Sequence, residues 1–263
     1  MRTRQWIGTV AAIAAMAGQA LAAPYVILTD GRRVEGQRIR ALPDGTINLV
    51  TAQGTVSYQK GMYTKAVADK PAELAQADAA FAQKNYDAAI KVLEKVAKEY
   101  RYLDWDLQAQ KKLAEAYLEK GDGEGAAKAY TQLFQMSPAE KQVSENAWGQ
   151  RKALLVSKQY ATLQRQLDAV AAEGPRSEAA KAQNMRGDIQ LAQNNLEDAV
   201  MDYLRTAILF KDVADAEIQG EACFKAAQIL EQMRDTARAK ELYRMAAQDW
   251  KGSSWAQKAQ GKF

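Results

Sequence analysis

Histidine is absent from the 263 residues, and cysteine occurs once, as Cys223. Histidine is the commonest general base and the commonest zinc ligand, so its absence removes the usual proton-transfer group and the usual zinc anchor together. It also excludes an imidazole-based pH switch near neutrality. A single cysteine cannot form an internal disulfide. A chain with so few cysteines avoids incorrect disulfide pairing in an oxidising compartment, and this weakly favours export.

A strong charge of one sign is also lacking. The formal net charge is +4, and it falls to about +2 without Arg2 and Arg4, which lie in a segment that we expect to be removed. This balance is too near neutral to indicate nucleic-acid binding. There is no phosphate loop and no nucleophile motif. Neighbouring carboxylates such as Glu197 and Asp198 would point apart on a helix. We therefore predict a protein that is not an enzyme and has no cofactor or metal.

The N-terminal segment has the three parts of a secretory signal peptide. Arg2 and Arg4 precede an apolar run over residues 6–17, and Ala20-Leu21-Ala22 forms a small-x-small cleavage site. We predict a signal peptide at residues 1–22, cleaved after Ala22, and a mature chain in the periplasm or cell envelope. An uncleaved anchor is the alternative, but the run is shorter than the roughly 20 residues needed to span a bilayer. No stable membrane span is therefore expected after cleavage.

Residues 24–70 have the composition of a small β module. Ile47 and Leu49 fall on one face of a strand, and Val56 and Tyr58 do so on the next, as period-two burial requires. We expect four or five short strands in a meander. Three dipeptides mark its turns by supplying positive φ: Asp30-Gly31, Asp44-Gly45 and Gln53-Gly54.

The stretch from Asp30 to Gly36 resembles the start of small SH3-like or Sm-like barrels, with Gly36 where a strand would bend. In such barrels a basic surface would suggest RNA binding, but export disfavours that function. We interpret the basic side chains as a solvated face. They are Arg32, Arg33, Arg38 and Arg40.

Residues 71–263 have a helical period and an internal repeat. Polar turns recur before a second helix, and Lys70-Pro71 separates this region from the β module. The turns are marked by Tyr86, Gly123, Tyr160, Leu196 and Thr236, at spacings of 37, 37, 36 and 40 residues.

The residues around these markers resemble the tetratricopeptide repeat (TPR) family, whose unit is a helical hairpin of about 34 residues with small residues where the helices cross. Nine residues before the marker, four of the five repeats have a small residue. Three residues after the marker, four of the five again have a small residue. The third repeat departs from the pattern with Arg151 and Leu163. The small residues are Ala77, Ala114, Gly187 and Ala227 before the markers, and Ala89, Ala126, Ala199 and Ala239 after them. The large residues expected to pack against them are Leu93, Tyr130, Leu167, Tyr203 and Tyr243.

The resemblance implies a mainly α fold, a solenoid of about five TPR-like hairpins preceded by a small β-barrel or meander. The ending from Asp249 to Ala256 also resembles the closing turn of repeat proteins in the Tol-Pal and outer-membrane assembly systems. Both resemblances imply a scaffold that binds other proteins in the cell envelope.

Stacked hairpins leave a concave surface lined by the first helix of each unit. Its aromatic residues and alternating charges suit a peptide or helix with apolar anchors. The family's clamp for a C-terminal carboxylate is not reproduced, because its paired asparagines and lysines are not assembled. The predicted groove residues are Leu74, Asp78, Phe81, Lys111, Glu115, Trp148, Lys152, Asn184, Asp188, Phe224 and Gln228.

Several of these residues also have a purely structural interpretation. Trp148 and Phe224 fit a groove and the core between repeats equally well. Tyr100, Tyr102 and Trp105 form either a recognition patch or, as we favour, packing for a longer loop. Cys223 is expected to be a small buried hydrophobe.

Two functions remain open at this point, and a minor enzyme or lytic accessory is kept only as a remainder. The first is a periplasmic adaptor whose groove docks a segment of an envelope complex. The second is a cell-wall tether, in which the β module binds glycan or peptidoglycan and the repeats act as a spacer.

Overall fold

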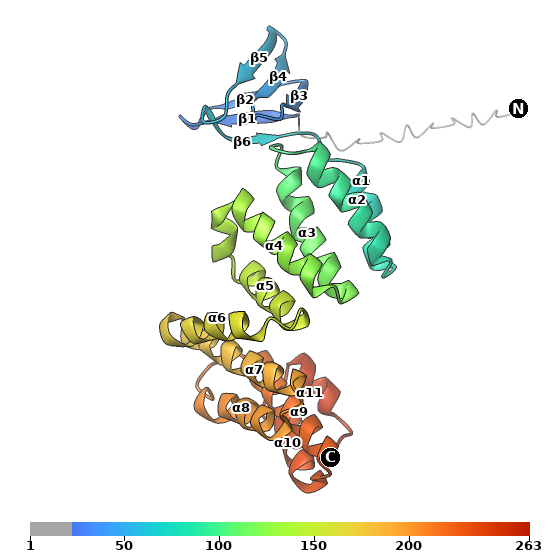
Figure 1. Cartoon of the computed structure of the whole chain (residues 1–263), viewed down its shortest axis with the longest axis vertical. Coiled ribbons are helices and arrows are strands. Elements are labelled where there is room, and N and C mark those ends of the chain that lie inside the picture. Colours follow the sequence, from blue (N-terminus) through green and yellow to red (C-terminus); the bar gives the residue numbers. More distant parts are fainter. Residues whose placement is uncertain (1–22) are drawn as a thin grey trace, which may run out of the picture. The chain divides into compact units, whose positions relative to one another are not determined.

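The computed structural model describes residues 23–263, so the predicted signal peptide lies outside the described residues (Figure 1). The chain forms two compact units. One combines residues 23–74 with residues 96–106, and the other combines residues 75–95 with 107–263. Within the described residues, no helix combines the length and apolar character needed to cross a membrane.

The β module contains six strands, one more than the upper limit that we expected. They form two antiparallel three-stranded sheets with the orders β2-β1-β6 and β3-β4-β5. Because β1 pairs with β6, the first and last strands meet and the module is not a simple meander. The strands are β1 Tyr25–Leu28, β2 Arg33–Glu35, β3 Arg38–Ala41, β4 Ile47–Thr51, β5 Gly54–Tyr58 and β6 Tyr63–Val67.

Glycines act in this module as their sequence context predicts. Gly31, Gly45 and Gly54 all have positive φ, so the three predicted turns are confirmed. A Cβ on Gly36 would lie 2.6 Å from a side-chain carbon of Leu49, so only glycine fits there. The backbone therefore approaches β4 closely at this point.

The core of the β module contains Ile47, Leu49 and Tyr58, as the alternation predicts. Val56 is 40% exposed, although it pairs with the fully buried Leu49. It lies on β5, an edge strand of its sheet, and this position leaves its side chain in contact with solvent.

The aromatic loop between the first two repeats belongs to this core. Leu103 is buried in it, and Tyr100, Tyr102 and Trp105 pack against it. The Trp105 indole Nε1–H donates to the Ala68 carbonyl oxygen at 2.8 Å. The packing interpretation of these aromatic residues is therefore confirmed, although their partner is the β module.

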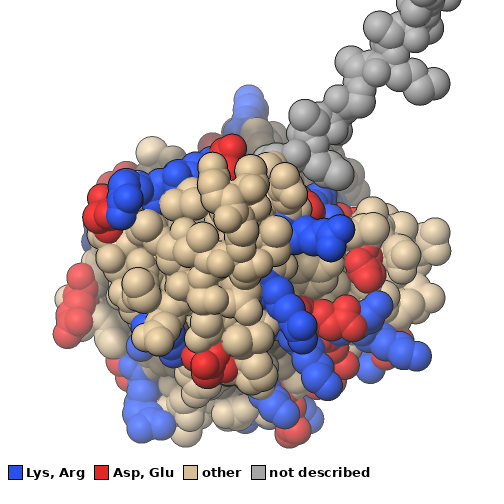
Figure 2. Space-filling model, turned by 90° about the horizontal axis from the view of Figure 1, so that it is seen from above, with Lys and Arg blue, Asp and Glu red and all other residues tan. Residues whose placement is uncertain are grey.

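The arginines of the β module are partly neutralised by local carboxylates. Arg32 pairs with Asp30 at 2.7 Å, and Arg33 pairs with Glu35 at 2.9 Å. Figure 2 shows Lys and Arg side chains lying among Asp and Glu side chains and uncharged residues on the face that it presents. This mixture matches the solvated face that the sequence suggested.

The rest of the chain forms five consecutive helical hairpins and a short closing helix, so the TPR-like fold is confirmed (Figure 1). The first helices of the hairpins are α1 Glu73–Ala82, α3 Trp105–Lys120, α5 Ser144–Val156, α7 Arg176–Ala192 and α9 Ala216–Gln232. The second helices are α2 Tyr86–Glu99, α4 Gly123–Met136, α6 Tyr160–Glu173, α8 Leu196–Leu209 and α10 Thr236–Gln248. A 3-10 turn, η1 Pro138–Gln142, precedes α5, and α11 Ser254–Ala259 closes the chain.

All five hairpin turns have the same backbone geometry. Two residues before each marker the chain adopts positive φ, at Lys84, Gly121, Lys158, Asn194 and Arg234. The next residue donates its N–H to a carbonyl five residues earlier, as Asn85 does to Ala80 at 2.8 Å and Asp235 to Leu230 at 2.8 Å. This bond satisfies a carbonyl that the helix end would otherwise leave free. The same turn conformation therefore occurs in all five hairpins.

The expected small and large residues also meet in the core. Ala89, Ala126, Ala199 and Ala239 are buried, and so are all five of the large residues. A Cβ on Gly187 would lie 2.8 Å from the Tyr203 ring. Hence α7 and α8 approach each other at a distance that only glycine permits.

Gly121 gives a direct test of the shared turn. Its φ is +82°, a conformation that costs an L-residue roughly 1–2 kcal/mol. We expect Gly121→Ala to lower the free energy of unfolding by about 1 kcal/mol in urea denaturation. Glu119→Ala, an exposed change in the last turn of the preceding helix α3, serves as the control. Equal denaturation midpoints for the two variants would contradict the prediction.

Candidate functional site

The first helices of neighbouring hairpins are joined by polar contacts at intervals of about one repeat. Lys112 on α3 pairs with Asp78 on α1. The Trp148 indole on α5 donates to Glu178 on α7 at 2.6 Å, and Lys225 on α9 pairs with Asp188 on α7 at 2.7 Å. The predicted groove residues therefore belong to one row of helices, which we call the first-helix row.

The predicted groove residues differ in their access to solvent. Four are exposed, namely Asp78, Glu115, Lys152 and Gln228. Four are half-buried, namely Phe81, Lys111, Trp148 and Asp188. Three are buried, namely Leu74, Asn184 and Phe224.

The three buried residues have to be removed from the predicted groove. The Phe224 ring lies 5.4 Å from the rings of Tyr243 and Trp255, so its core interpretation is the correct one. Asn184 donates its amide to the Ile218 carbonyl at 2.9 Å, and Leu74 is 3% exposed. The sequence places these residues on first helices but does not show that their faces are covered by other elements.

The half-buried residues are engaged within the protein. Lys111 pairs with Glu140 at 2.7 Å, and the Phe81 ring meets Tyr86 edge-on at 5.5 Å. Asp188 accepts the Tyr203 hydroxyl at 2.6 Å as well as Lys225. These contacts are internal to the protein. Of the exposed residues, Asp78 pairs with Lys112, whereas Glu115, Lys152 and Gln228 remain for a partner.

Lys225 is the centre of a half-buried charge cluster that the sequence analysis missed. Its Nζ lies 2.7 Å from Asp188 and 2.6 Å from Glu221. Burial lowers the pKa of Lys225, but the two carboxylates outweigh it and the pKa is raised above its ordinary value. Burial, followed by the charge of Asp188, raises the pKa of Tyr203 strongly. The 37-residue spacing from Asp188 to Lys225, equal to one repeat, was the available signal.

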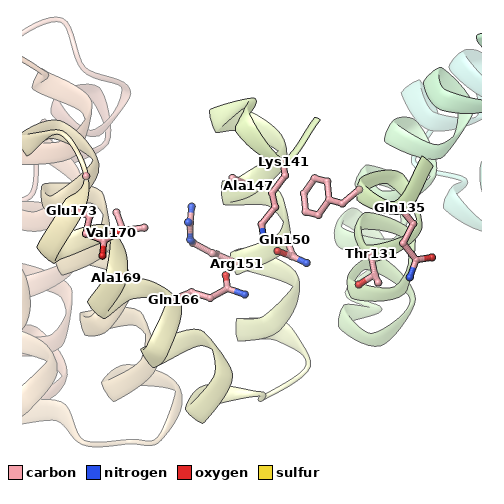
Figure 3. Close-up of a pocket in the computed structure, with 12 residues that line it drawn as sticks. Thr131, Gln135, Lys141, Ala147, Gln150, Arg151, Gln166, Ala169, Val170 and Glu173 are labelled. Atoms are coloured by element: carbon pink, nitrogen blue, oxygen red, sulfur yellow. The ribbon is translucent and has the colours of Figure 1, made fainter. Parts of the chain in front are cut away.

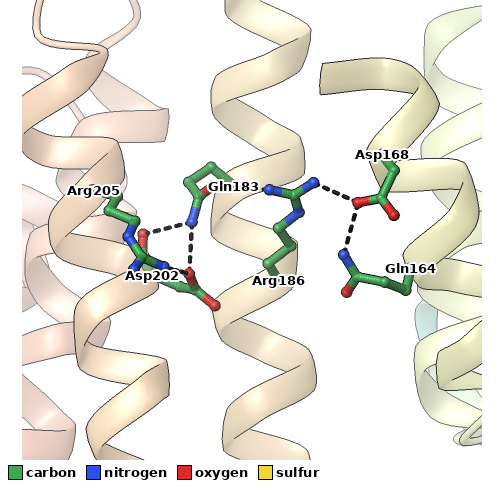
Figure 4. A network of polar contacts seen from close by, with 6 residues as sticks. All are labelled: Gln164, Asp168, Gln183, Arg186, Asp202 and Arg205. Carbon is green, nitrogen blue, oxygen red and sulfur yellow. Dashed lines mark hydrogen bonds and ion pairs between the residues drawn. The ribbon is translucent and has the colours of Figure 1, made fainter. Parts of the chain in front are cut away.

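A second polar network fixes α6, α7 and α8 to one another (Figure 4). Asp168 on α6 accepts from Arg186 on α7 at 2.5 Å. Gln183 on α7 donates to the Asp202 carboxylate on α8 at 2.9 Å, and Arg205 also pairs with Asp202. These bonds connect helices of two successive repeats, so we interpret the network as a structural link between the repeats.

Cys223 is fully buried on α9, as expected for a small hydrophobe. Burial raises the pKa of its thiol to about 11, so the reactive thiolate is scarce at neutral pH. Within residues 23–263, no three His, Cys, Asp or Glu side chains cluster in a way that could hold a metal ion.

A pocket of about 670 Å³ lies in the third repeat. It lies between the second helix of repeat two and the two helices of repeat three, and Figure 3 shows Arg151 extending into the space between α5 and α6. Its lining includes Phe134 on α4, Lys141 on η1, Arg151 on α5 and Val170 on α6.

Arg151 has no hydrogen bond or ion pair among the described residues. Its buried Nε–H has no acceptor, and its guanidinium stacks over the Trp148 ring at 4.6 Å. Burial lowers the pKa of Arg151, while Glu178 opposes this shift. The sequence marked this position only as an unexpected large residue.

Comparisons with known proteins identify the class of fold. A tetratricopeptide repeat model matches residues 74–141 and 154–217, and another tetratricopeptide repeat model matches residues 220–248. These matches cover more than half of the chain, which therefore belongs to the tetratricopeptide repeat family. The unmatched residues 142–153 contain most of α5, the helix that carries Arg151.

One similar solved structure is MamA, from residue 41 to its end, of Desulfovibrio magneticus RS-1. The two chains share 16% sequence identity with a TM-score of 0.47, and the similarity covers 72% of this chain and 95% of that one. None of the curated proteins matches the chain.

The Lys225 cluster predicts alkaline destabilisation. Folded-state pKa values of Tyr203 and Lys225 are raised above their ordinary values of 10.0 and 10.5, so the folded protein retains protons that the unfolded chain releases. The free energy of unfolding should therefore fall as pH rises from about 9 to about 11. Tyr203→Phe should show a smaller fall in urea denaturation, because that tyrosine no longer titrates. Identical pH slopes for the two proteins would contradict this role.

Proposed function

We propose that this protein is an exported, non-catalytic adaptor of the bacterial cell envelope that binds a peptide or helix of a partner protein along the first-helix row. The observation that carries the proposal is the stack of five hairpins, whose family is typically one of protein–protein interaction scaffolds. Export is supported by the signal-like start of the sequence, and an envelope complex by the resemblance of the C-terminal segment to Tol-Pal and outer-membrane assembly proteins.

The exposed residues of the first-helix row define what such a partner would meet. Asp78, Glu115, Lys152 and Gln228 extend over repeats one, two, three and five. Although the Glu115 residue is exposed, its carboxylate is partly desolvated by neighbouring atoms; this desolvation, followed by the nearby Glu145, raises its pKa, so the environment disfavours more negative charge. A segment with alternating charge would complement Glu115 and Lys152.

Charge exchange on this row tests the proposal. We expect the mature protein to capture a specific partner from a cross-linked envelope extract, identified by mass spectrometry. The double variant Glu115→Lys/Lys152→Glu should lose that partner, because both charges are reversed while the net charge is unchanged. A matched control, Glu124→Lys/Lys128→Glu, makes the same exchange on exposed positions of α4.

The outcome separates the adaptor from the cell-wall tether. Retention of the partner by the row variant would reject the first-helix row as its binding site. Retention of cell-wall fragments alone by every form would favour glycan binding by the β module. The whole mature chain is needed in this assay, because Leu103 belongs to the core of the β module.

Export has a test of its own. When the full sequence is expressed in a Gram-negative host, the protein recovered from the periplasm should begin at Ala23, as measured by intact mass and N-terminal sequencing. Replacing Ala20 and Ala22 by large residues should block cleavage and leave the longer form, because signal cleavage requires small residues there. Recovery of the uncleaved native protein from the cytoplasm would reject the proposal.

A further inference from the structure

The third hairpin is closed at its turn and open at its other end. Near the turn, Leu154 on α5 joins Leu163 and Leu167 on α6 in one buried cluster. Further from the turn, Arg151 occupies a position that is alanine or glycine in the other four repeats. A long cationic side chain cannot be enclosed where a methyl group fits, so the helices diverge and the pocket forms between them.

The cation in this pocket lacks an anionic partner. The charge of Glu178 acts on Arg151, but this carboxylate already accepts the Trp148 indole at 2.6 Å and Lys181 at 3.0 Å. Arg151 therefore contacts Glu178 only indirectly, by stacking on Trp148. The Arg151 guanidinium is partly desolvated and its N–H donors are free within residues 23–263. It is therefore suited to bind a carboxylate through two parallel hydrogen bonds.

The remaining lining indicates what accompanies that carboxylate. Phe134 and Val170 provide apolar surface. Lys141 adds a second positive charge to the lining, which contains one carboxylate, Glu173. Three amide side chains, each a donor and an acceptor, also line the pocket and can pair with peptide groups. They are Gln135, Gln150 and Gln166.

We propose that this pocket binds an acidic side chain, Asp or Glu, that stands beside a large apolar residue in a segment of the partner protein. The carboxylate would pair with Arg151, and the apolar side chain would contact Phe134 and Val170. The volume of about 670 Å³ lies within the range of pockets that enclose ligand groups. The inference rests on the proposed scaffold function and assigns it a second contact region, distinct from the exposed charges of the first-helix row.

The test is selection from a displayed library of random short peptides, with the mature protein as bait. We expect peptides that carry an acidic residue next to an aromatic or large aliphatic residue to be enriched. Bait with Arg151→Gln should lose this enrichment, whereas Arg165→Gln, which removes an exposed arginine from α6, should keep it. Bait with Arg151→Glu should select basic residues at the acidic position.

Affinity measurements on a selected peptide give the magnitude. With its ends acetylated and amidated, so that only the side-chain carboxylate is present, the peptide should bind Arg151→Gln roughly ten- to a hundredfold more weakly in fluorescence anisotropy. Changing the peptide's Glu to Gln should weaken binding to the native protein by a similar factor. That second comparison decides the question even if Arg151→Gln fails to fold by circular dichroism.

Three outcomes would overturn the inference: no enriched peptide, enrichment without acidic residues, or equal binding by native protein and Arg151→Gln. Partner capture that depends on Glu115 and Lys152 but is unchanged in Arg151→Gln would reject the pocket and leave the scaffold function intact. Loss of the partner in both variants would show that the two regions bind one segment together.

Discussion

Close contact between a small residue on one helix and a large residue on its neighbour is the constraint on which the repeat stack depends. A Cβ on Gly187 would lie 2.8 Å from the Tyr203 ring, and one on Gly149 would lie 2.0 Å from the Tyr130 hydroxyl. Neither rigid ring can retreat, because both are buried. The first contact sets the spacing within a hairpin and the second sets the spacing between hairpins. These two contacts place α7 against α8 and α5 against α4.

The same packing determines which polar groups remain available. Once the helices are in place, residues one repeat apart meet on neighbouring first helices, and ion pairs such as Asp188–Lys225 form between them. An ion pair in a partly buried site must be well matched to offset its desolvation, which limits substitution on both sides. Asp188 and Lys225 of repeats four and five are therefore used to join the repeats, whereas Glu115 and Lys152 in repeats two and three remain exposed.

The sequence predicted those features that depend on local periodicity. The five helical turns and the small and large positions repeat at fixed offsets, the turn glycines of the β module follow from local dipeptides, and the structure confirms both. The features that it did not predict depend on contacts between distant segments. Trp105 donates to Ala68 across 37 residues, and nothing near either residue indicates that pairing. The burial of Phe224 likewise depends on Trp255 of the closing helix, which the repeat pattern does not include.

The third repeat combines a packing defect with an unpaired charge, and the two have one cause. A large apolar residue at position 151 would also separate α5 from α6, but it would fill the gap and bury itself. Arginine separates the helices and leaves a half-buried cation with an unsatisfied Nε–H, which costs stability that an apolar residue would not. A carboxylate brought by a partner would satisfy that group and recover part of this free energy on binding. Arg151, which destabilises the free protein, is thus also the residue at which a bound partner can add the most stabilising free energy.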